Sequence, residues 1–391
     1  MAGDGTAGVE IVKAGRHVAL VTPRLVKRDG QGRVNYEVVK RWIAQGGSVT
    51  ALTFDVEPEL LDEKRFQWVP TGTASLPSDL LRSQFFSLQS GRWLARRRGE
   101  YDIVHTNGSV SLSASDINSC HFVHGAWAAS TEHTSRSNRS VYGLYHRMLT
   151  ALHARQEKIA YGRARHVVAI SQHVREQLLA IGVPDEKIRV IWNGIDIDEF
   201  RPGTGDRAAL GLPKERFLAL FAGDMRTPRK NLDTVLAAIR AIPAIHLVIV
   251  GDLTRNPYPA KVRQMGLADR VTFLGFRTDV ANVMRAVDAF VYPARYEPLG
   301  LVVLEALASG LPVLTAATTG ASALVDHNCG LVLQDPNDAK TLERFLERLI
   351  ADPPLRRRMG EAARQRALTH TWRHMADEYT EMYERIAAGA S

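Results

Sequence analysis

The segment PARYEPLGLVVLEALASGLPVLTAATTG, residues 293–320, decides the predicted fold, because it contains a strand end, a turn, a helix and a further strand. The apolar run AFVYPA (289–294) predicts the first strand, and LPVLTA (311–316) predicts the second. Between them, the turn EPLG (297–300) leads into the helical stretch LVVLEALASG (301–310). Strands that alternate with helices predict a parallel sheet with helices on both faces.

The same alternation extends over the whole chain and predicts an α/β protein built from two Rossmann-like, doubly wound domains. Amphipathic patterns predict helices over 34–46 and 231–241, with a last helix near 373–388. Short β-branched apolar runs predict further strands at 17–22, 48–54, 102–107, 121–125, 166–171, 217–223, 246–252 and 271–276.

The chain of 391 residues is long enough for two domains. A segment rich in Asn, Gly, Asp and Pro, VIWNGIDIDEFRPGTGD, predicts a linker near 195–210. We therefore expect an N-terminal domain over 1–200, a C-terminal domain over 201–372, and a terminal helix over 373–391. Two such sheets would face a central cleft at their carboxyl ends, where doubly wound sheets bind ligands.

The turn before residue 301 has the features of a diphosphate site. Gly300 carries no side chain that would block a ligand, and the amides of Gly300, Leu301 and Val302 lie where a helix presents unpaired N–H groups. Glu297 precedes these amides and Glu305 follows eight residues later. One carboxylate can accept hydrogen bonds from sugar hydroxyls while the other accepts a pair from ribose. The simpler interpretation is a buried helix with two surface glutamates.

A second strand–turn–helix element, FAGDMRTPRKNLDTV (221–235), places three cations beside a predicted helix start. Arg226, Arg229 and Lys230 cannot complement the helix dipole there, because a helix N-terminus favours anions. Their charge is therefore expected to face something negative, such as a pyrophosphate leaving group. A solvated basic turn is the alternative.

With these stretches, the chain resembles the family-4 (group 1) retaining glycosyltransferases of the GT-B fold, over nearly its whole length. Glu297 and Glu305 match the family's Glu-x7-Glu pattern. The stretches VVAISQHVREQL, VIWNGIDIDEFRP, VTFLGF and the terminal TWRHMADEYTEMY add to the resemblance in the expected order.

The resemblance implies a role for each matched residue. Glu297 would contact the donor sugar and Glu305 the ribose, while Lys230 and the amides near Gly300 would hold the diphosphate. Phe276 and Arg277 would line the base pocket. In the N-terminal half, Gly30 and Gly32 would form a Gly-rich loop before Arg33, and His124 in HFVHG would approach the transferred sugar. The predicted catalytic residues are His124, Lys230 and Glu297.

Three positions depart from the family pattern. Asp224 stands where the family usually has Arg directly after the turn glycine, so Arg226 or Arg229 is expected to supply that charge. Gln31 interrupts the usual glycine pair, and Ser322 lies in the segment after Gly320 where the family often carries Glu.

The resemblance implies metal-independent, hexosyltransferase-type transfer from a nucleotide diphosphate sugar, UDP- or GDP-linked, to a glycan or glycolipid acceptor. The implied setting is polysaccharide, lipopolysaccharide or glycoconjugate biosynthesis. No cofactor or metal is expected: Asp196 and Asp198 lie in the linker, and His121 and His124 lack further partners with zinc spacing. A nucleotide-sugar 2-epimerase of the same fold and a non-catalytic donor-binding subunit remain alternatives.

The even spread of charge gives no domain-wide basic face, so we expect no nucleic-acid partner. The two distant cysteines, Cys120 and Cys329, fit a reducing compartment, so we expect a cytoplasmic protein. The net charge of +8 is spread evenly over both halves, and no stretch is apolar enough to span a membrane. Two basic clusters stand out, one at 92–98 and one at 136–165. Solvated helix faces are the simpler interpretation. The alternative is peripheral contact with an anionic membrane surface or a phosphate-bearing acceptor.

Overall fold

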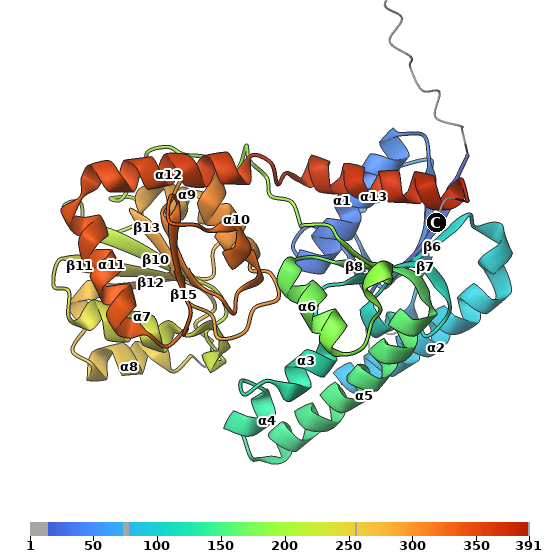
Figure 1. Cartoon of the computed structure of the whole chain (residues 1–391), viewed down its shortest axis with the longest axis horizontal. Helices are drawn as coiled ribbons and strands as arrows, with labels where there is room; N and C mark the ends of the chain where they lie inside the picture. Colours follow the sequence, from blue (N-terminus) through green and yellow to red (C-terminus); the bar gives the residue numbers. More distant parts are fainter. Residues whose placement is uncertain (1–14, 73–77, 255, 390–391) are drawn as a thin grey trace, which may run out of the picture. The chain divides into compact units, whose positions relative to one another are not determined.

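The computed structural model describes residues 15–72, 78–254 and 256–389 (Figure 1). Contacts divide these residues into two compact units, each formed from more than one segment of chain. The first unit contains the described residues up to Ser119, then Ile159–His166, and those from Ala376 onward. The second contains Cys120–Lys158 and Val167–Met375. The domain boundaries expected near residues 200 and 372 stay predictions.

The first sheet is doubly wound around strand β1 (His17–Val21), which pairs in parallel with β3 on one side and β6 on the other. The chain fills the β3 side first and then returns to β6, so the strand order reverses beside β1. The sheet has the order β5 (Phe66–Pro70), β3 (Ser48–Thr53), β1, β6 (Ile103–Asn107), β7 (Ser115–Cys120), β8 (Ala164–Ala169) and β9 (Ile188–Val190).

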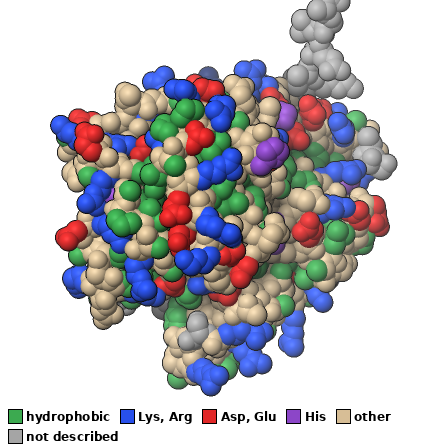
Figure 2. All heavy atoms as spheres, turned by 60° about the vertical axis from the view of Figure 1, so that its left-hand side comes forward, with side chains coloured by type: hydrophobic (Ala, Val, Ile, Leu, Met, Phe, Trp, Pro, Cys, Tyr) green, Lys and Arg blue, Asp and Glu red, His purple; other side chains and the backbone are tan. Residues whose placement is uncertain are grey.

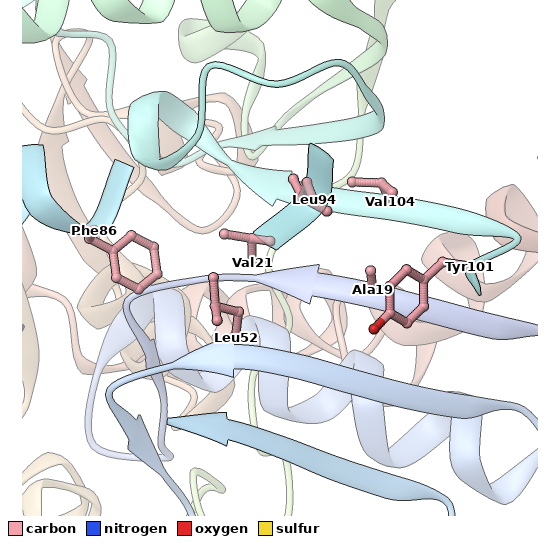
Figure 3. Close-up of a cluster of buried hydrophobic side chains, with 7 residues drawn as sticks. All are labelled: Ala19, Val21, Leu52, Phe86, Leu94, Tyr101 and Val104. Atoms are coloured by element: carbon pink, nitrogen blue, oxygen red, sulfur yellow. The ribbon is translucent and has the colours of Figure 1, made fainter. Parts of the chain in front are cut away.

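Helix α2 (Asp79–Arg97) covers one face of this sheet through an apolar cluster (Figure 3). Phe86 and Leu94 project from α2 towards the strands and are each 2% exposed. Because they lie eight residues apart, about two helical turns, they bury one side of α2 and leave the other side in solvent. The strands and the segment before β6 contribute the remaining members of the cluster, Ala19, Val21, Leu52, Tyr101 and Val104.

Helices α1 (Gly30–Ala44) and α13 (Trp372–Ala387) lie side by side, as Figure 1 shows. The buried ring of Trp42 meets Tyr383 edge-to-face, with centroids 5.4 Å apart. The Tyr383 hydroxyl lies 2.6 Å from Nδ1 of the buried His105 on β6. These contacts attach the C-terminal helix to the first sheet.

The second sheet is also doubly wound and parallel, and its strand order reverses between β10 (Phe217–Ala222) and β13 (Ala289–Tyr292). All six residues of β10 are buried, as expected for a strand covered on both faces. The order is β12 (Val271–Gly275), β11 (Ile245–Val250), β10, β13, β14 (Val313–Ala316) and β15 (Gly330–Leu333).

Helix α7 (Leu232–Arg240) packs on α11 (Ala339–Ala351), and α10 (Leu301–Ala308) packs on α12 (Pro353–Ala367). The shorter helices α8 (Tyr258–Gln264) and α9 (Val280–Ala286) complete the connections. The loops that follow β10 and β13 leave neighbouring strands at their carboxyl ends, which brings residues 223–231 and 293–300 together.

Two element predictions were wrong. The stretch HFVHG (121–125) is not a strand: β7 ends at Cys120, and helix α3 (His124–Ala129) begins within the stretch. Gly30 and Gly32 do not form a loop, because α1 begins at Gly30. The side chain of Asp29 caps this helix by accepting a hydrogen bond from the Gly32 amide at 2.7 Å.

The basic segment 136–165 is divided among two helices and a strand. Helix α4 (Thr134–Ser137) ends before α5 (Val141–Arg163) begins, and Arg165 belongs to β8. Helix α6 (Gln172–Ala180) follows β8. Among the residues that the structure describes, no helix has both the length and the apolar composition that crossing a membrane requires.

The contact between Tyr383 and His105 makes a testable contribution to stability. Replacing Tyr383 by Phe removes a hydroxyl that hydrogen-bonds a buried ring nitrogen, which should lower the free energy of unfolding by about 1–2 kcal/mol. The exposed Tyr142 offers a matched control, since Tyr142→Phe should change it by less than about 0.5 kcal/mol. Urea denaturation followed by tryptophan fluorescence would measure both; equal stabilities for the two variants would contradict this assignment.

Candidate functional site

Asn231 fixes the loop after β10 to the loop after β13. It adopts the left-handed conformation, with φ 62°, and its side-chain oxygen accepts hydrogen bonds from Thr234 at the start of α7. Its amide nitrogen donates to the carbonyl oxygen of Pro293 at 2.9 Å and to that of Pro336 at 2.7 Å. One buried side chain therefore caps a helix and holds the two loops together, directly beside Lys230.

Lys230 and Glu297 form an ion pair at this point. The Tyr292 hydroxyl donates a second hydrogen bond to the same carboxylate at 2.8 Å, and the Lys230 ammonium lies 5.4 Å from the centroid of the Tyr292 ring. Burial acts to raise the pKa of Glu297, but the charges of Lys230 and Arg229 hold it below its ordinary value. Burial lowers the pKa of Lys230, and Glu297 opposes that shift. The pair is partly buried, and the charge of each partner favours the charged form of the other.

The two predicted arginines, Arg226 and Arg229, differ in whether a nearby acid pairs with them. The Arg226 guanidinium donates two hydrogen bonds of 2.9 Å to the carboxylate of Asp224, which neutralises its charge at an exposed position. Arg229 is half-buried and forms no ion pair within the described part of the chain. Its charge instead lowers the pKa of Glu297. Of the two, Arg229 is thus the cation that remains available to an anionic ligand.

The N-terminus of α10 presents backbone amides without a side-chain cap. Gly300 occupies the N-cap position with φ 87°, and no described side chain hydrogen-bonds to this end of the helix. A Cβ atom at position 300 would lie 3.0 Å from Thr319 Cγ2 and 3.3 Å from Glu297 Cγ. The absence of a side chain and the left-handed backbone are both needed here. The amides of Leu301 and Val302 follow at the positive end of the helix dipole, where an anion is stabilised.

Glu305 lies one turn further along α10 and is half-buried. Burial, and then the carboxylate of Glu199, raises its pKa to about 7. Near neutral pH this carboxyl group can therefore either donate or accept a hydrogen bond.

Phe276 and Arg277 follow β12, the edge strand of the same sheet, at the same carboxyl edge. The Phe276 ring is 76% exposed, which leaves its face free to stack on a planar ligand. Arg277 donates two hydrogen bonds, of 2.8 and 2.7 Å, to the carboxylate of Asp279. No contact joins either residue to Lys230 or Glu297 in the described structure.

His124 is held by a carboxylate that the sequence did not reveal. The backbone N–H groups of His124 and Gly125 donate to the two oxygens of Glu157 on α5, at 2.8 and 2.6 Å. Burial and the nearby His153 lower the pKa of His124 to about 3, so its imidazole stays neutral. Burial raises the pKa of Glu157 to about 7, and its two backbone hydrogen bonds oppose that rise.

Aromatic rings connect the His124 segment with the segment that carries Glu297. Phe122 and Trp127 flank His124 in sequence, and both pack on Tyr296, with ring centroids 5.8 and 4.8 Å from it. Tyr296 immediately precedes Glu297 in the chain. The Ser171 hydroxyl also donates to the carbonyl oxygen of Pro298, at 2.7 Å.

The remaining predicted residues lie in the first unit, at the point where its strand order reverses. Gly30 and Gly32 form the first turn of α1. A Cβ atom at position 32 would come within 2.7 Å of the Val26 carbonyl oxygen, which requires glycine there. Arg33 pairs with Glu37 one turn later, at 2.6 Å.

The described residues contain no group of three or more His, Cys, Asp or Glu side chains that could hold a metal ion. Asp196 instead stabilises a turn, because its carboxylate accepts hydrogen bonds from the amides of Asp198 and Glu199 at 3.1 and 3.0 Å.

Comparisons with known proteins match this architecture in both halves. The model of "Glycosyltransferase Family 4" matches residues 28–199, and that of "Glycosyl transferases group 1" matches residues 204–366. The D-inositol 3-phosphate glycosyltransferase of Mycolicibacterium gilvum is 30% identical over 313 residues, covering 74% of this chain and 67% of the relative. That of Jonesia denitrificans is 29% identical over 336 residues, covering 76% and 74%.

Solved structures share the fold at low sequence identity. Sucrose-phosphate synthase from Thermosynechococcus elongatus superposes with a TM-score of 0.76 at 22% identity, covering 96% of this chain and all of that one. WaaG, a glycosyltransferase involved in lipopolysaccharide biosynthesis, gives 0.74 at 22% identity, covering 94% and 99%. Anabaena HepE, in complex with UDP and glucose, gives 0.71 at 21%, with the same coverage. The predicted GT-B fold is confirmed, and the chain belongs to the group 1, family 4 glycosyltransferases.

Proposed function

We propose that this glycosyltransferase transfers a sugar from a UDP- or GDP-linked donor to an acceptor hydroxyl, with retention of anomeric configuration and without a metal ion. The observation that carries the proposal is the ion pair of Lys230 and Glu297 beside the uncapped N-terminus of α10. A diphosphate needs cations and amide donors, and a hexose needs a carboxylate. Cations, amide donors and a carboxylate all lie in the two loops that follow β10 and β13.

The proposed step begins with the donor diphosphate on the amides of Gly300, Leu301 and Val302. The bond between the anomeric carbon and the phosphate oxygen breaks, and its electron pair stays on that oxygen. Lys230, Arg229 and the α10 dipole stabilise the developing negative charge. The acceptor hydroxyl attacks from the same face and forms the new bond, and its proton passes to the leaving phosphate.

The carboxylates would orient the donor. Glu297 would accept hydrogen bonds from sugar hydroxyls, and Glu305 would accept a pair from the ribose. Phe276, with its exposed ring, and Arg277 would contact the base. Neutral His124 would approach the transferred sugar, and Glu157 would position it through the backbone. Gly32 would contact the donor, and Gly30 and Arg33 would serve the acceptor side.

The acceptor would be a glycan or glycolipid in the synthesis of polysaccharide, lipopolysaccharide or another glycoconjugate. The curated relatives named for D-inositol 3-phosphate also make a phosphate-bearing polyol a candidate. We place the protein in the cytoplasm, peripherally at the inner face of the membrane. A 2-epimerase would convert the donor alone into an epimer, and a non-catalytic subunit would bind donor without turnover. Product analysis with and without acceptor separates both from a transferase.

Donor binding tests the proposal first. A saturating UDP- or GDP-sugar should raise the melting temperature by several degrees, since ligand at 100 times its Kd adds about 2.7 kcal/mol. Lys230→Ala should abolish this shift and lower kcat/KM by about 100-fold or more. The control Lys340→Ala, at an exposed lysine of α11, should retain both. If no nucleotide sugar stabilises the wild-type protein, the donor assignment fails.

The two arginines provide a second test. Arg229→Ala should lower kcat/KM for the donor by about 10-fold or more, because its charge is free to meet the diphosphate. Arg226→Ala should lower it by less than about threefold, because Asp224 already neutralises that guanidinium. Initial rates at donor concentrations below KM would measure both; a larger loss in the Arg226 variant would reverse the assignment.

Glu305 should give a pH-dependent stability signature. Its pKa is raised from 4.5 to about 7 on folding, so the folded protein holds a proton that the unfolded chain has lost between these values. The free energy of unfolding contributed by Glu305 therefore falls as pH rises through this window. Relative to wild type, Glu305→Gln should gain on the order of 2 kcal/mol from pH 4.5 to 7, and no more above that.

Urea denaturation at a series of pH values would measure this gain. The control Glu347→Gln, at an exposed glutamate of α11, should show no such trend. A constant difference between Glu305→Gln and wild type would show that the carboxyl group does not titrate in this window.

A further inference from the structure

The start of helix α5 exposes an apolar stripe to solvent. Val141, Leu144 and Met148 are 85%, 57% and 67% exposed, and their spacing places them on one side of the helix. Tyr142 lies beside them and is 56% exposed. Four large apolar side chains within eight residues are thus left in water, although single exposed apolar residues are usual on a protein surface.

The opposite side of α5 packs against neighbouring residues, so the exposed stripe belongs to a helix that is held in place. Gly143 is buried, and a Cβ atom there would lie 1.7 Å from the Asn138 carbonyl oxygen. Buried Thr150 lies 3.0 Å from the ring of His133. Glu157 is buried on the same side, where it holds the His124 segment. Packing therefore fixes which side of the helix faces outward.

The surroundings of the stripe are strongly basic. Residues 133–156 include no Asp or Glu. They include four arginines, at 136, 139, 147 and 155, all exposed, and none forms an ion pair with another described residue. Figure 2 shows a group of Lys and Arg side chains at the lower edge of the view, where few Asp or Glu side chains lie among them.

We propose that this α4–α5 surface, comprising Val141, Tyr142, Leu144, Met148 and the four arginines, docks on an anionic phospholipid bilayer. The apolar side chains would enter the boundary between headgroups and acyl chains, and the guanidinium groups would bind lipid phosphates. A nucleic acid would satisfy the arginines but leave the apolar stripe in water, so the lipid surface fits better. The inference rests on the peripheral membrane placement under the proposed function and identifies the surface responsible.

Vesicle binding tests the proposal on the full chain. Wild-type protein should bind vesicles with about one-third phosphatidylglycerol at least 10-fold more tightly than vesicles of phosphatidylcholine alone. Raising the salt concentration above about 0.1 M should weaken this binding. Leu144→Glu/Met148→Glu should lower the partition coefficient at least 10-fold. Arg136→Ala/Arg139→Ala/Arg147→Ala should lower it about 100-fold, at roughly fivefold per arginine.

A matched double variant controls for added negative charge. Leu61→Glu/Leu368→Glu changes two exposed leucines elsewhere, 51% and 37% exposed, and should bind within about twofold of wild type. All variants should keep the wild-type melting temperature and donor turnover with a water-soluble acceptor. If the wild-type protein showed no donor turnover, the proposed function would fail, whatever the result for the docking surface.

Two results would overturn the docking surface. One is wild-type protein that does not bind anionic vesicles. The other is binding of both α4–α5 variants at the wild-type level. Tight binding to RNA that survives Leu144→Glu/Met148→Glu, without vesicle binding, would assign the basic surface to nucleic acid.

Discussion

The ion pair of Lys230 and Glu297 depends on one property of the second sheet, the reversal of strand order between β10 and β13. At such a reversal, the loops from two neighbouring strands diverge and leave a crevice at the strand ends. Asn231, in the loop after β10, spans this divergence with hydrogen bonds to Pro293 and Pro336, which follow β13 and β15, at the cost of a left-handed backbone. The chemistry of the site is therefore set by sheet topology first and by side chains second.

The pair also organises the groups around it. Tyr292 and Lys230 approach the same carboxylate, and the glycine at position 300 leaves room for that carboxylate beside the first amides of α10. Cations near a helix N-terminus raise the local positive potential, and one acid partly offsets it. The site therefore keeps a positive charge, because Asp224 pairs with Arg226 but no described acid pairs with Arg229.

Much of the fold and part of the site could be predicted from sequence, because the relevant signals are local. The buried strands of the second sheet are continuous apolar runs, and Glu297, Gly300 and Glu305 fall within one strand–turn–helix segment. Strand β7 was missed because most of its buried side chains are polar. Asn118 and Ser119 are satisfied by hydrogen bonds to Gly108 and His105, which hydropathy cannot detect.

The residues that could not be predicted act over long sequence distances or through pairing. Glu157 lies 33 residues from His124 and contacts only its backbone, so no spacing rule identifies it. The different environments of Arg226 and Arg229 arise from which side chain reaches Asp224, and this depends on the turn geometry after β10. The prediction of HFVHG as a strand was wrong because the apolar residues of this stretch do not indicate a helix start. Glu157, which is distant in sequence, accepts hydrogen bonds from the first amides of that helix.

The two amides bound by Glu157 have a consequence for protein engineering. A Cβ atom at position 125 would lie 3.0 Å from the Glu157 oxygen and 2.9 Å from Ile181 Cγ2, so any larger residue would push the carboxylate away from both amides. A substitution at position 125 would therefore also remove the contact that holds the His124 backbone. Variants that change the later residues of α3 would keep both hydrogen bonds, whereas most substitutions at position 125 would lose them.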